Sequence, residues 1–320
     1  MGLTHASTGT GAADAGLLIE KYSPSDRVIA LAGNPNVGKS TLFNALTGMR
    51  QHTGNWPGKT VTNAQGRHTR HGREYILVDL PGTYSLMAHS AEEEVARDFL
   101  CFGGSGASDE PGGRSAADGA VVVCDATCLE RNLNLVLQTL EITPWTVVCV
   151  NLMDEARGKG IEVDLKALSD RLGVPVVGTS ASRGEGLERL MGAVESMTGS
   201  AAPPPASRVC YPAPIEAAVA RLAPVLEASL DGQLPVRWVA LRLLDEDASL
   251  MDSLHRCLGR DLTVDPRVSE ALALVRRELE GAGWSREGVR DAIVATLVRT
   301  GAEIAGAVVT YRREDAARRD

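Results

Sequence analysis

The sequence has 320 residues, 44% of them apolar, and a formal net charge of −8. This length leaves room for two domains, and the apolar fraction is that of an ordinary globular protein. The negative charge argues against a general nucleic-acid-binding surface, which needs a basic face, so we expect no nucleic acid partner. Because no run of about 18 uncharged apolar residues occurs and the first residues lack a signal pattern, we expect a soluble, cytoplasmic chain.

The chain begins with residues 1–26, which are rich in Gly, Ala, Ser and Thr, and we predict that they are disordered. A strand is predicted over 27–32, and a complete GxxxxGK[ST] motif, GNPNVGKS, occupies 33–40. A helical pattern over 39–48 follows, so the motif has the strand, loop and helix context that a phosphate-binding loop requires.

In this loop, glycine allows the backbone to wrap closely around phosphate oxygens, and the amides of the first helical turn point at the anion. Lys39 would bridge the β- and γ-phosphates, and Ser40 would bind Mg²⁺. The alternative is a structural glycine turn. We predict that the nucleotide is bound by Gly33, Asn34, Pro35, Asn36, Val37, Gly38, Lys39, Ser40 and Thr41.

Residues 51–60, QHTGNWPGKT, contain two glycines and a proline, which argue against a regular helix or strand. We predict a mobile first switch loop with an exposed Trp56. Gly58, Lys59 and Thr60 would contact the nucleotide, and Thr60 would reach Mg²⁺ when a γ-phosphate is present. The alternative is a plain surface loop.

Strands predicted over 61–68 and 73–80 lead into a DxxG element, Asp79 to Gly82. Asp79 would hold the Mg²⁺ shell through water, and the Gly82 amide would sense the γ-phosphate. An ordinary strand-ending turn is the alternative. Ras-like GTPases carry a water-orienting Gln after this element, whereas this chain has Thr83, so we expect slow hydrolysis.

The base-binding signal is NLMD at 151–154, which follows a strand predicted over 145–150 and resembles NKxD with Leu at the Lys position. Asp154 would accept two hydrogen bonds from guanine, and adenine lacks that donor pair. An Asn and an Asp that cap the next helix are the alternative. After a strand predicted over 175–179, Ser180, Ala181 and Ser182 match the fifth GTPase element, in which the Ala181 amide would contact guanine O6.

The remaining pattern alternates strand and helix, which predicts an α/β fold with a mainly parallel sheet and helices on both faces. The further strand is predicted over 119–125, and helices over 91–101, 129–141, 164–172 and 185–198. Residues 103–118 have low complexity and are either a tolerated disordered insertion or a docking loop.

A linker over 199–210, with three prolines in a row, separates the predicted 27–198 nucleotide-binding domain from a helical domain over 211–314 and a tail over 315–320. Helices are predicted over 213–229, 236–244, 247–258, 266–281 and 286–311. The helical domain is either a self-contained bundle or a lever that reports the nucleotide state.

These segments together resemble a known family. GNPNVGKSTLFNALTG, QHTGNWPGKTVT, DLPGTYSL, CDATCLERNLNLVLQTLE, NLMDEARGKGI and SASRGEGLERL resemble the cytoplasmic G domain of ferrous iron transport protein B (FeoB), and YPAPIE and RWVALRLL resemble its helical domain. The departures are Ser40, where Thr is commoner, and Lys59, where an apolar residue is usual.

The resemblance implies a Ras-like P-loop GTPase fold, followed by a small helical domain that acts like a GDP-dissociation inhibitor. It implies a slowly hydrolysing GTPase switch module of a bacterial iron(II) transporter, at the cytoplasmic face of the inner membrane. The implied partners are GTP and GDP, the transporter's transmembrane region, small cytoplasmic Feo accessory proteins and a second copy of the chain.

The resemblance also implies site roles and cofactors. Asn151, Asp154 and Ala181 would bind guanine, and Asn34 would hold an activating K⁺. The Mg²⁺ ligands would be Ser40, Thr60 and Asp79. We therefore expect the catalytic groups to be Lys39, Thr60, Gly82 and Asn34. The alternatives are a soluble ribosome-assembly-type GTPase and a nucleotide sensor with negligible turnover.

Overall fold

The computed structural model describes residues 19, 21–48, 51–56, 61–87, 90–102, 117–245 and 248–312. Three predicted site residues, Gly58, Lys59 and Thr60, lie outside the described residues, as do most of the 103–118 insertion and the 315–320 tail.

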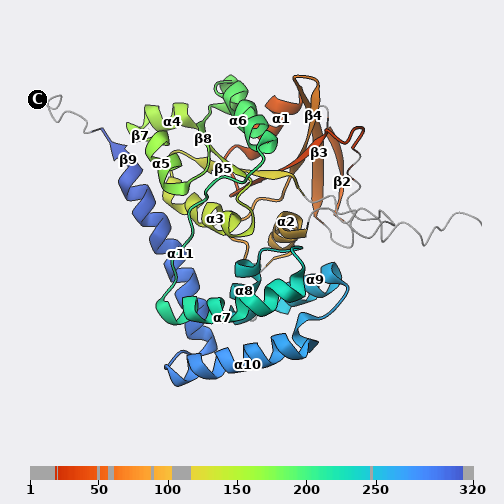
Figure 1. Cartoon of the computed structure of the whole chain (residues 1–320). Coiled ribbons are helices and arrows are strands. Elements are labelled where there is room, and N and C mark those ends of the chain that lie inside the picture. Colours follow the sequence, from red (N-terminus) through yellow and green to blue (C-terminus); the bar gives the residue numbers. More distant parts are fainter. Residues whose placement is uncertain are drawn as a thin grey trace, which may run out of the picture.

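A seven-stranded sheet in the order β2-β3-β4-β1-β5-β6-β8 forms the centre of the molecule (Figure 1). The strands β1, β4, β5, β6 and β8 pair in parallel, and the hairpin strand β3 runs antiparallel to β2 and β4. The mainly parallel α/β fold is confirmed. The strands are β1 Arg27–Gly33, β2 Gln51–Asn55, β3 Thr62–Arg70, β4 Arg73–Asp79, β5 Gly119–Asp125, β6 Thr146–Asn151 and β8 Val176–Gly178.

Helices cover both faces of this sheet because its central strands are apolar on both sides, as parallel strands usually are. Helices α1 (Lys39–Thr47) and α6 (Leu187–Gly199) cover one face. Helices α2 (Ala91–Phe102), α3 (Leu129–Ile142) and α5 (Leu165–Leu172) cover the other. A short helix, α4 (Met153–Gly158), follows β6.

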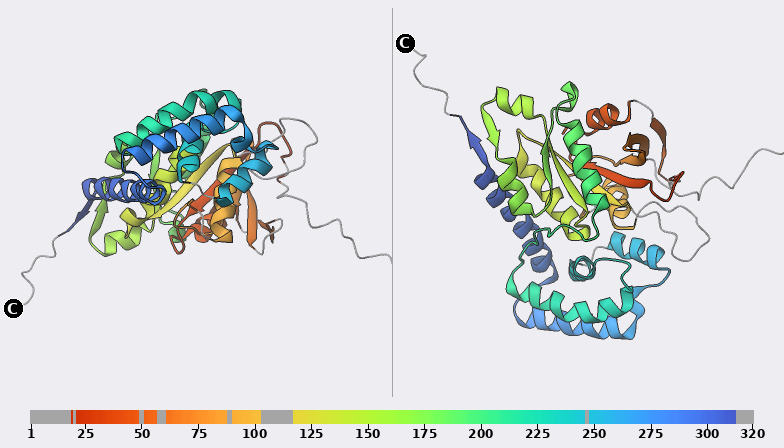
Figure 2. Two further views of the ribbon diagram at one scale, coloured as in Figure 1. Left: turned by 90° about the horizontal axis from the view of Figure 1, so that it is seen from below. Right: turned by 45° about the horizontal axis from the view of Figure 1, so that its top comes forward.

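Residues 213–245 and 248–308 form a helical layer beneath α2 and α3 (Figures 1 and 2). Its helices are α7 Ala213–Leu230, α8 Val236–Asp245, α9 Ala248–Leu258, α10 Pro266–Gly281 and α11 Arg286–Val308. No helix within the described part of the chain is long and apolar enough to cross a membrane.

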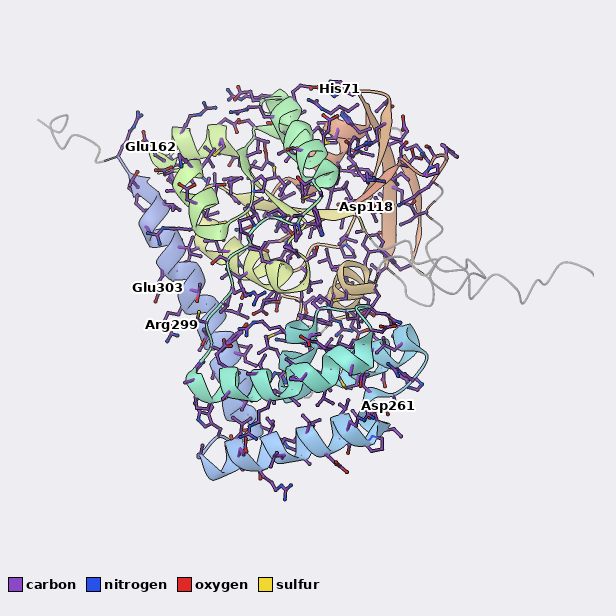
Figure 3. The ribbon with its side chains drawn as sticks, viewed as in Figure 1. His71, Asp118, Glu162, Asp261, Arg299 and Glu303 are labelled. Carbon is purple, nitrogen blue, oxygen red and sulfur yellow. The ribbon has the colours of Figure 1, made fainter. Side chains whose placement is uncertain are left out.

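Helix α11 leaves this layer and packs along α3, so the helical domain is not a self-contained bundle. In Figure 3, the labelled Arg299 and Glu303 lie along α11 on its way to Glu162. The predicted helix over 286–311 ends at Val308, because β9 (Val309–Tyr311) pairs antiparallel with β7 (Ile161–Val163) of the first domain. This pairing joins distant parts of the sequence and has no local signal.

The prediction for the first switch segment was wrong in two respects. Residues 51–55 form the edge strand β2, whose Gly54 pairs with Asn63 of β3. An edge position tolerates glycine because only one side of the strand is paired. Trp56 is buried, with 8% of its surface exposed, and its ring packs edge-to-face on Phe99 of α2 at 5.5 Å between centroids.

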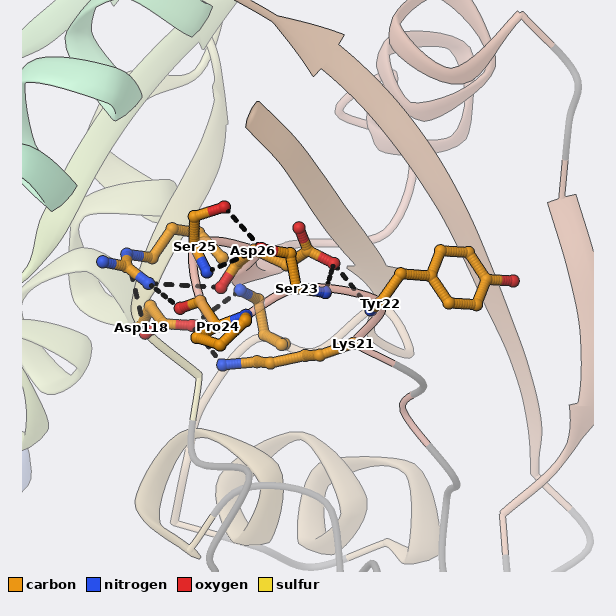
Figure 4. Close-up of polar contacts among 9 residues, drawn as sticks. Lys21, Tyr22, Ser23, Pro24, Ser25, Asp26 and Asp118 are labelled. Atoms are coloured by element: carbon orange, nitrogen blue, oxygen red, sulfur yellow. Dashed lines mark hydrogen bonds and ion pairs between the residues drawn. The ribbon is translucent and has the colours of Figure 1, made fainter. Parts of the chain in front are cut away.

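The disorder prediction for 1–26 was wrong for its last six residues. The Asp26 carboxylate accepts hydrogen bonds from the amides of Tyr22 and Ser23, and Lys21 forms a 3.0 Å ion pair with Asp118 (Figure 4). Asp118 also accepts a 2.7 Å hydrogen bond from the amide of Val28 in β1. These contacts hold the segment against the start of the sheet, and composition alone does not predict them.

Candidate functional site

The phosphate-binding loop lies between β1 and α1, at the carboxyl end of the parallel strands. A Cβ atom on Gly33 would lie 2.8 Å from the carbonyl oxygen of Val123, and one on Gly38 would lie 2.5 Å from Asn151 Nδ2. Gly38 also has φ +79°, which side chains disfavour. Both glycines are therefore required by the packing of the loop against β5 and β6.

The loop and the DxxG element meet because β1 and β4 are neighbours, with Leu31 in register with Asp79. The Lys39 ammonium group contacts the Asp79 carboxylate and the carbonyl oxygen of Leu80. Ser40 Oγ lies 3.5 Å from Asp79 Oδ2. A hydroxyl and a carboxylate thus converge beside a lysine, and such a set of groups could hold Mg²⁺ and phosphate.

The end of the DxxG element packs directly on the phosphate-binding loop. A Cβ atom on Gly82 would lie 3.3 Å from Pro35, and the Thr83 amide donates a 3.1 Å hydrogen bond to Gly33 O. The buried Thr83 hydroxyl donates to Ser85 O at 2.6 Å. This hydroxyl is therefore engaged in its own turn.

Asn34 is an unsatisfied polar residue in the phosphate-binding loop. Only 3% of its surface is exposed, and neither its amide nitrogen nor its amide oxygen has a hydrogen-bond partner among the described residues. Such a buried group calls for an explanation, and a bound ion is one. An amide oxygen is a suitable ligand for K⁺, because protein oxygens can replace the ion's hydration shell.

The side chain of Asn151 connects three elements of the site. Its Nδ2 donates a 3.0 Å hydrogen bond to Val37 O in the phosphate-binding loop. Its Oδ1 accepts hydrogen bonds from the Thr179 hydroxyl and the Ala181 amide, both at 3.0 Å. Asn151 therefore holds the phosphate-binding loop and the fifth element in one rigid arrangement.

Asp154 lies beside these groups at the start of α4. Its amide donates to Ser180 Oγ at 3.2 Å, and its Oδ2 forms a 2.9 Å ion pair with Arg183 Nε. Burial alone would raise the pKa of Asp154, but hydrogen bonds from its own amide and from Ser180, together with Arg183, hold this pKa below its usual value. The carboxylate is thus kept ionised and able to accept hydrogen bonds.

Two predicted residues at the margin of the site, Thr41 and Ser182, are exposed. Sequence reasoning missed Gln138 of α3, whose Oε1 accepts hydrogen bonds from the Leu86 amide at 2.6 Å and from the Ser85 hydroxyl at 3.1 Å. It also missed Arg183. The ERNLNLVLQTLE pattern contained Gln138, but only the fold shows that it faces the segment after the DxxG element.

Comparison with known proteins decides the family. The family model for ferrous iron transport protein B matches residues 27–194, and the FeoB cytosolic helical domain model matches 211–310. This chain belongs to the ferrous iron transport protein B family. The Fe(2+) transporter FeoB of Salmonella typhimurium is 38% identical over 226 residues, covering 68% of this chain and 27% of that protein. The chain thus spans about a quarter of the length of the curated relatives it matches.

Solved structures of the family have the same fold. A mutant of S. thermophilus NFeoB bound to GDP matches with a TM-score of 0.72 and 30% identity, covering 89% of this chain and 100% of that one. The cytosolic domain of T. maritima FeoB in its GMPPNP form matches with a TM-score of 0.69 and 31% identity, covering 89% and 99%. The fold of a FeoB G domain followed by a helical domain is therefore confirmed.

Proposed function

We propose that this chain is the GTP-binding, slowly GTP-hydrolysing module of an iron(II) transporter. The observation that carries the proposal is the set of contacts made by Asn151, which fixes the phosphate-binding loop relative to Asp154 and Ala181. One site then offers phosphate ligands and a base-selective carboxylate together. The GDP and GMPPNP forms of the similar solved structures support the choice of guanine nucleotides.

At the phosphate end, Lys39 and the loop amides would bind the phosphates, and Gly82 would report the γ-phosphate through its amide. Ser40 and Asp79, with Thr60, would hold Mg²⁺, which supplies positive charge to the phosphate oxygens when bound. At the base end, Asp154 would accept hydrogen bonds from guanine. A buried carboxylate left unpaired by adenine costs about 1–3 kcal/mol.

Slow turnover follows from the position of Thr83. In the Ras-like arrangement, a side chain after the DxxG element orients the attacking water. The Thr83 hydroxyl instead donates to Ser85 O, so positioning by the loop backbone and by metal ions would have to supply the catalysis. The unsatisfied amide of Asn34 makes K⁺ the proposed second ion.

The transporter part of the proposal rests on the family. We place this module at the cytoplasmic face of the bacterial cell membrane, attached to the transmembrane region of an iron(II) transporter. Small accessory proteins and a second copy of the chain are its proposed protein partners.

Binding and turnover test the proposal separately. We expect GDP to bind about 100-fold or more tightly than ADP by calorimetry, because Asp154 accepts from the guanine donor pair. With Mg²⁺ we expect GTP hydrolysis on the order of 10⁻³ s⁻¹ or slower in Na⁺, and faster in K⁺. The diagnostic variant is Asn34→Ala, which should still bind GDP but lose the K⁺ effect on hydrolysis. Equal affinity for ADP would contradict the proposal, and tight GDP binding without any turnover would indicate a nucleotide sensor.

A further inference from the structure

The base-binding motif NLMD has Leu152 where the NKxD pattern has a lysine, so the motif itself supplies no cation near Asp154. Leu152 occupies that position with φ 60°, and one of its methyl groups would lie 3.7 Å from a Cβ on Gly38. Leu152 can therefore pack beside the loop but cannot supply a cation. The cation beside the Asp154 carboxylate is instead Arg183, directly after the fifth element.

The two oxygens of the Asp154 carboxylate have different surroundings. Oδ1 is buried and has no hydrogen-bond partner in the part of the chain that the structure describes. Oδ2 lies 2.9 Å from Arg183 Nε. Only 13% of this side chain is exposed, and Arg183 is the cation that pairs with it, alongside the hydrogen bonds from the Asp154 amide and from Ser180.

The backbone around Arg183 is fixed, although 63% of its side chain is exposed. The turn Ala181–Arg183 is closed by hydrogen bonds between the amides and carbonyls of Ser180 and Glu185, and the Arg183 amide donates to Ser180 O at 2.9 Å. The acid on the same turn, Glu185, pairs with Arg157 at 3.1 Å. The guanidinium of Arg183 therefore extends to Asp154 from a backbone whose position is fixed by these hydrogen bonds.

We propose that Arg183 is the positioning residue of the guanine site, because its guanidinium pairs with the Asp154 carboxylate. It fixes the rotamer of Asp154 through Oδ2 and leaves Oδ1 open to one guanine donor, while the second lone pair of Oδ2 can accept from the other. Guanine then meets a preorganised carboxylate and bears less of the entropy cost of ordering it. The inference rests on the proposed guanine-nucleotide function of the site.

The first test is the affinity for GDP measured by calorimetry. Because Arg183 is largely exposed, solvent weakens its pairing, and we expect Arg183→Ala to bind GDP about twofold to fivefold more weakly. Arg183→Lys should recover part of this loss. Arg157→Ala is the matched control, since Arg157 pairs with Glu185 and should leave the affinity unchanged. Tighter GDP binding by Arg183→Ala would overturn the proposal, because Arg183 would then compete with the base.

A double-mutant cycle shows whether Arg183 acts through the carboxylate. Xanthine has a carbonyl oxygen where guanine has an amino group, so Asp154→Asn should bind xanthosine diphosphate through its amide. In this background there is no carboxylate to position, and adding Arg183→Ala should leave the affinity for xanthosine diphosphate unchanged. An equal loss in both backgrounds would overturn the proposal. Failure of the proposed function itself would look different, because the wild-type chain would then bind ADP as well as GDP, or neither.

Discussion

The two faces of the central sheet are covered in different ways. On one face, α1 and α6 close a core that stays within the first domain, with Phe43, Leu190 and Met191 among its buried residues. On the other face, the core continues from the sheet through α2 and α3 into the helical layer. Val122 of β5, Leu133 of α3 and Leu241 of α8 belong to this one continuous cluster.

Helix α2 shows what this difference means for the predicted switch region. It follows the DxxG element, its Phe99 packs on Trp56 of the first switch segment, and its Phe102 packs on Trp238 of α8 at 6.5 Å between ring centroids. A dense core transmits displacement because its side chains have little free space. A movement of α2 must therefore repack the helical domain, whereas α1 and α6 have no such neighbour among the described residues.

The largest expected effect concerns Arg97, a fully buried cation at the junction of α2 and α9. Its guanidinium donates to Ser249 Oγ at 2.9 Å and to Ser253 Oγ at 3.3 Å, and it pairs with Asp98 at 2.8 Å. Arg97→Met keeps much of the volume but removes every donor. We expect it to lower the free energy of unfolding by about 3–5 kcal/mol, because polar partners are left buried without it. Urea denaturation measures this change.

Arg70 is the matched control on the other face. It pairs with Glu188 and Glu195 of α6 near the surface, where solvent and salt weaken ion pairs. We expect Arg70→Met to shift the urea midpoint far less than Arg97→Met. Equal shifts of the urea midpoint would show that the buried contacts of Arg97 stabilise the fold no more than the surface ion pairs of Arg70.

A slightly smaller loss of stability is expected from one matched leucine substitution in each of the two cores, and it compares the cores directly. Leu241 in α8 and Leu190 in α6 are both completely buried, and each Leu→Ala variant should lose about 3 kcal/mol of unfolding free energy. Because Leu241 shares its core with the first domain, we expect circular dichroism and tryptophan fluorescence to report one coincident transition in both variants. A fluorescence transition that precedes the loss of helix in Leu241→Ala alone would mean that the helical domain unfolds by itself.

The sequence was sufficient to predict that the GxxxxGKS loop and the DxxG element lie side by side, because both are marked by local features. The spacing of Gly33, Gly38 and Lys39 defines the loop, and alternating apolar segments define a parallel sheet that brings Asp79 beside it. Most helix and strand boundaries could be placed to within a residue or two for the same reason.

The features that sequence reasoning missed depend on contacts between distant segments. Trp56 is buried only because Phe99 of α2 lies over it, and α11 ends at Val308 only because β9 finds β7. Arg183 has no motif of its own and is found by its distance from Asp154. Local patterns cannot supply these pairings, because each depends on the completed fold.

The smallest expected effect is on the pH dependence of the unfolding free energy, to which one carboxyl group on each face contributes with opposite sign. On the face whose core continues into the helical layer, burial raises the pKa of Glu141 above its ordinary 4.5. This happens even though Tyr211 donates a hydrogen bond to the Glu141 carboxylate. On the other face, His71 and then Arg70 lower the pKa of Glu195 below 4.5.

The sign of each effect follows from which state binds more protons. Above pH 4.5 the folded state retains the Glu141 proton longer than the unfolded state, so this group's contribution to stability falls as the pH rises toward its raised pKa. Glu195 stabilises the fold above pH 4.5, and this contribution is lost as the pH falls through its lowered pKa. Unfolding free energies measured across this range should therefore lose the high-pH decline in Glu141→Gln and the low-pH decline in Glu195→Gln. Identical profiles for the two variants would contradict the distinction between a buried carboxyl at the domain junction and a paired one at the surface.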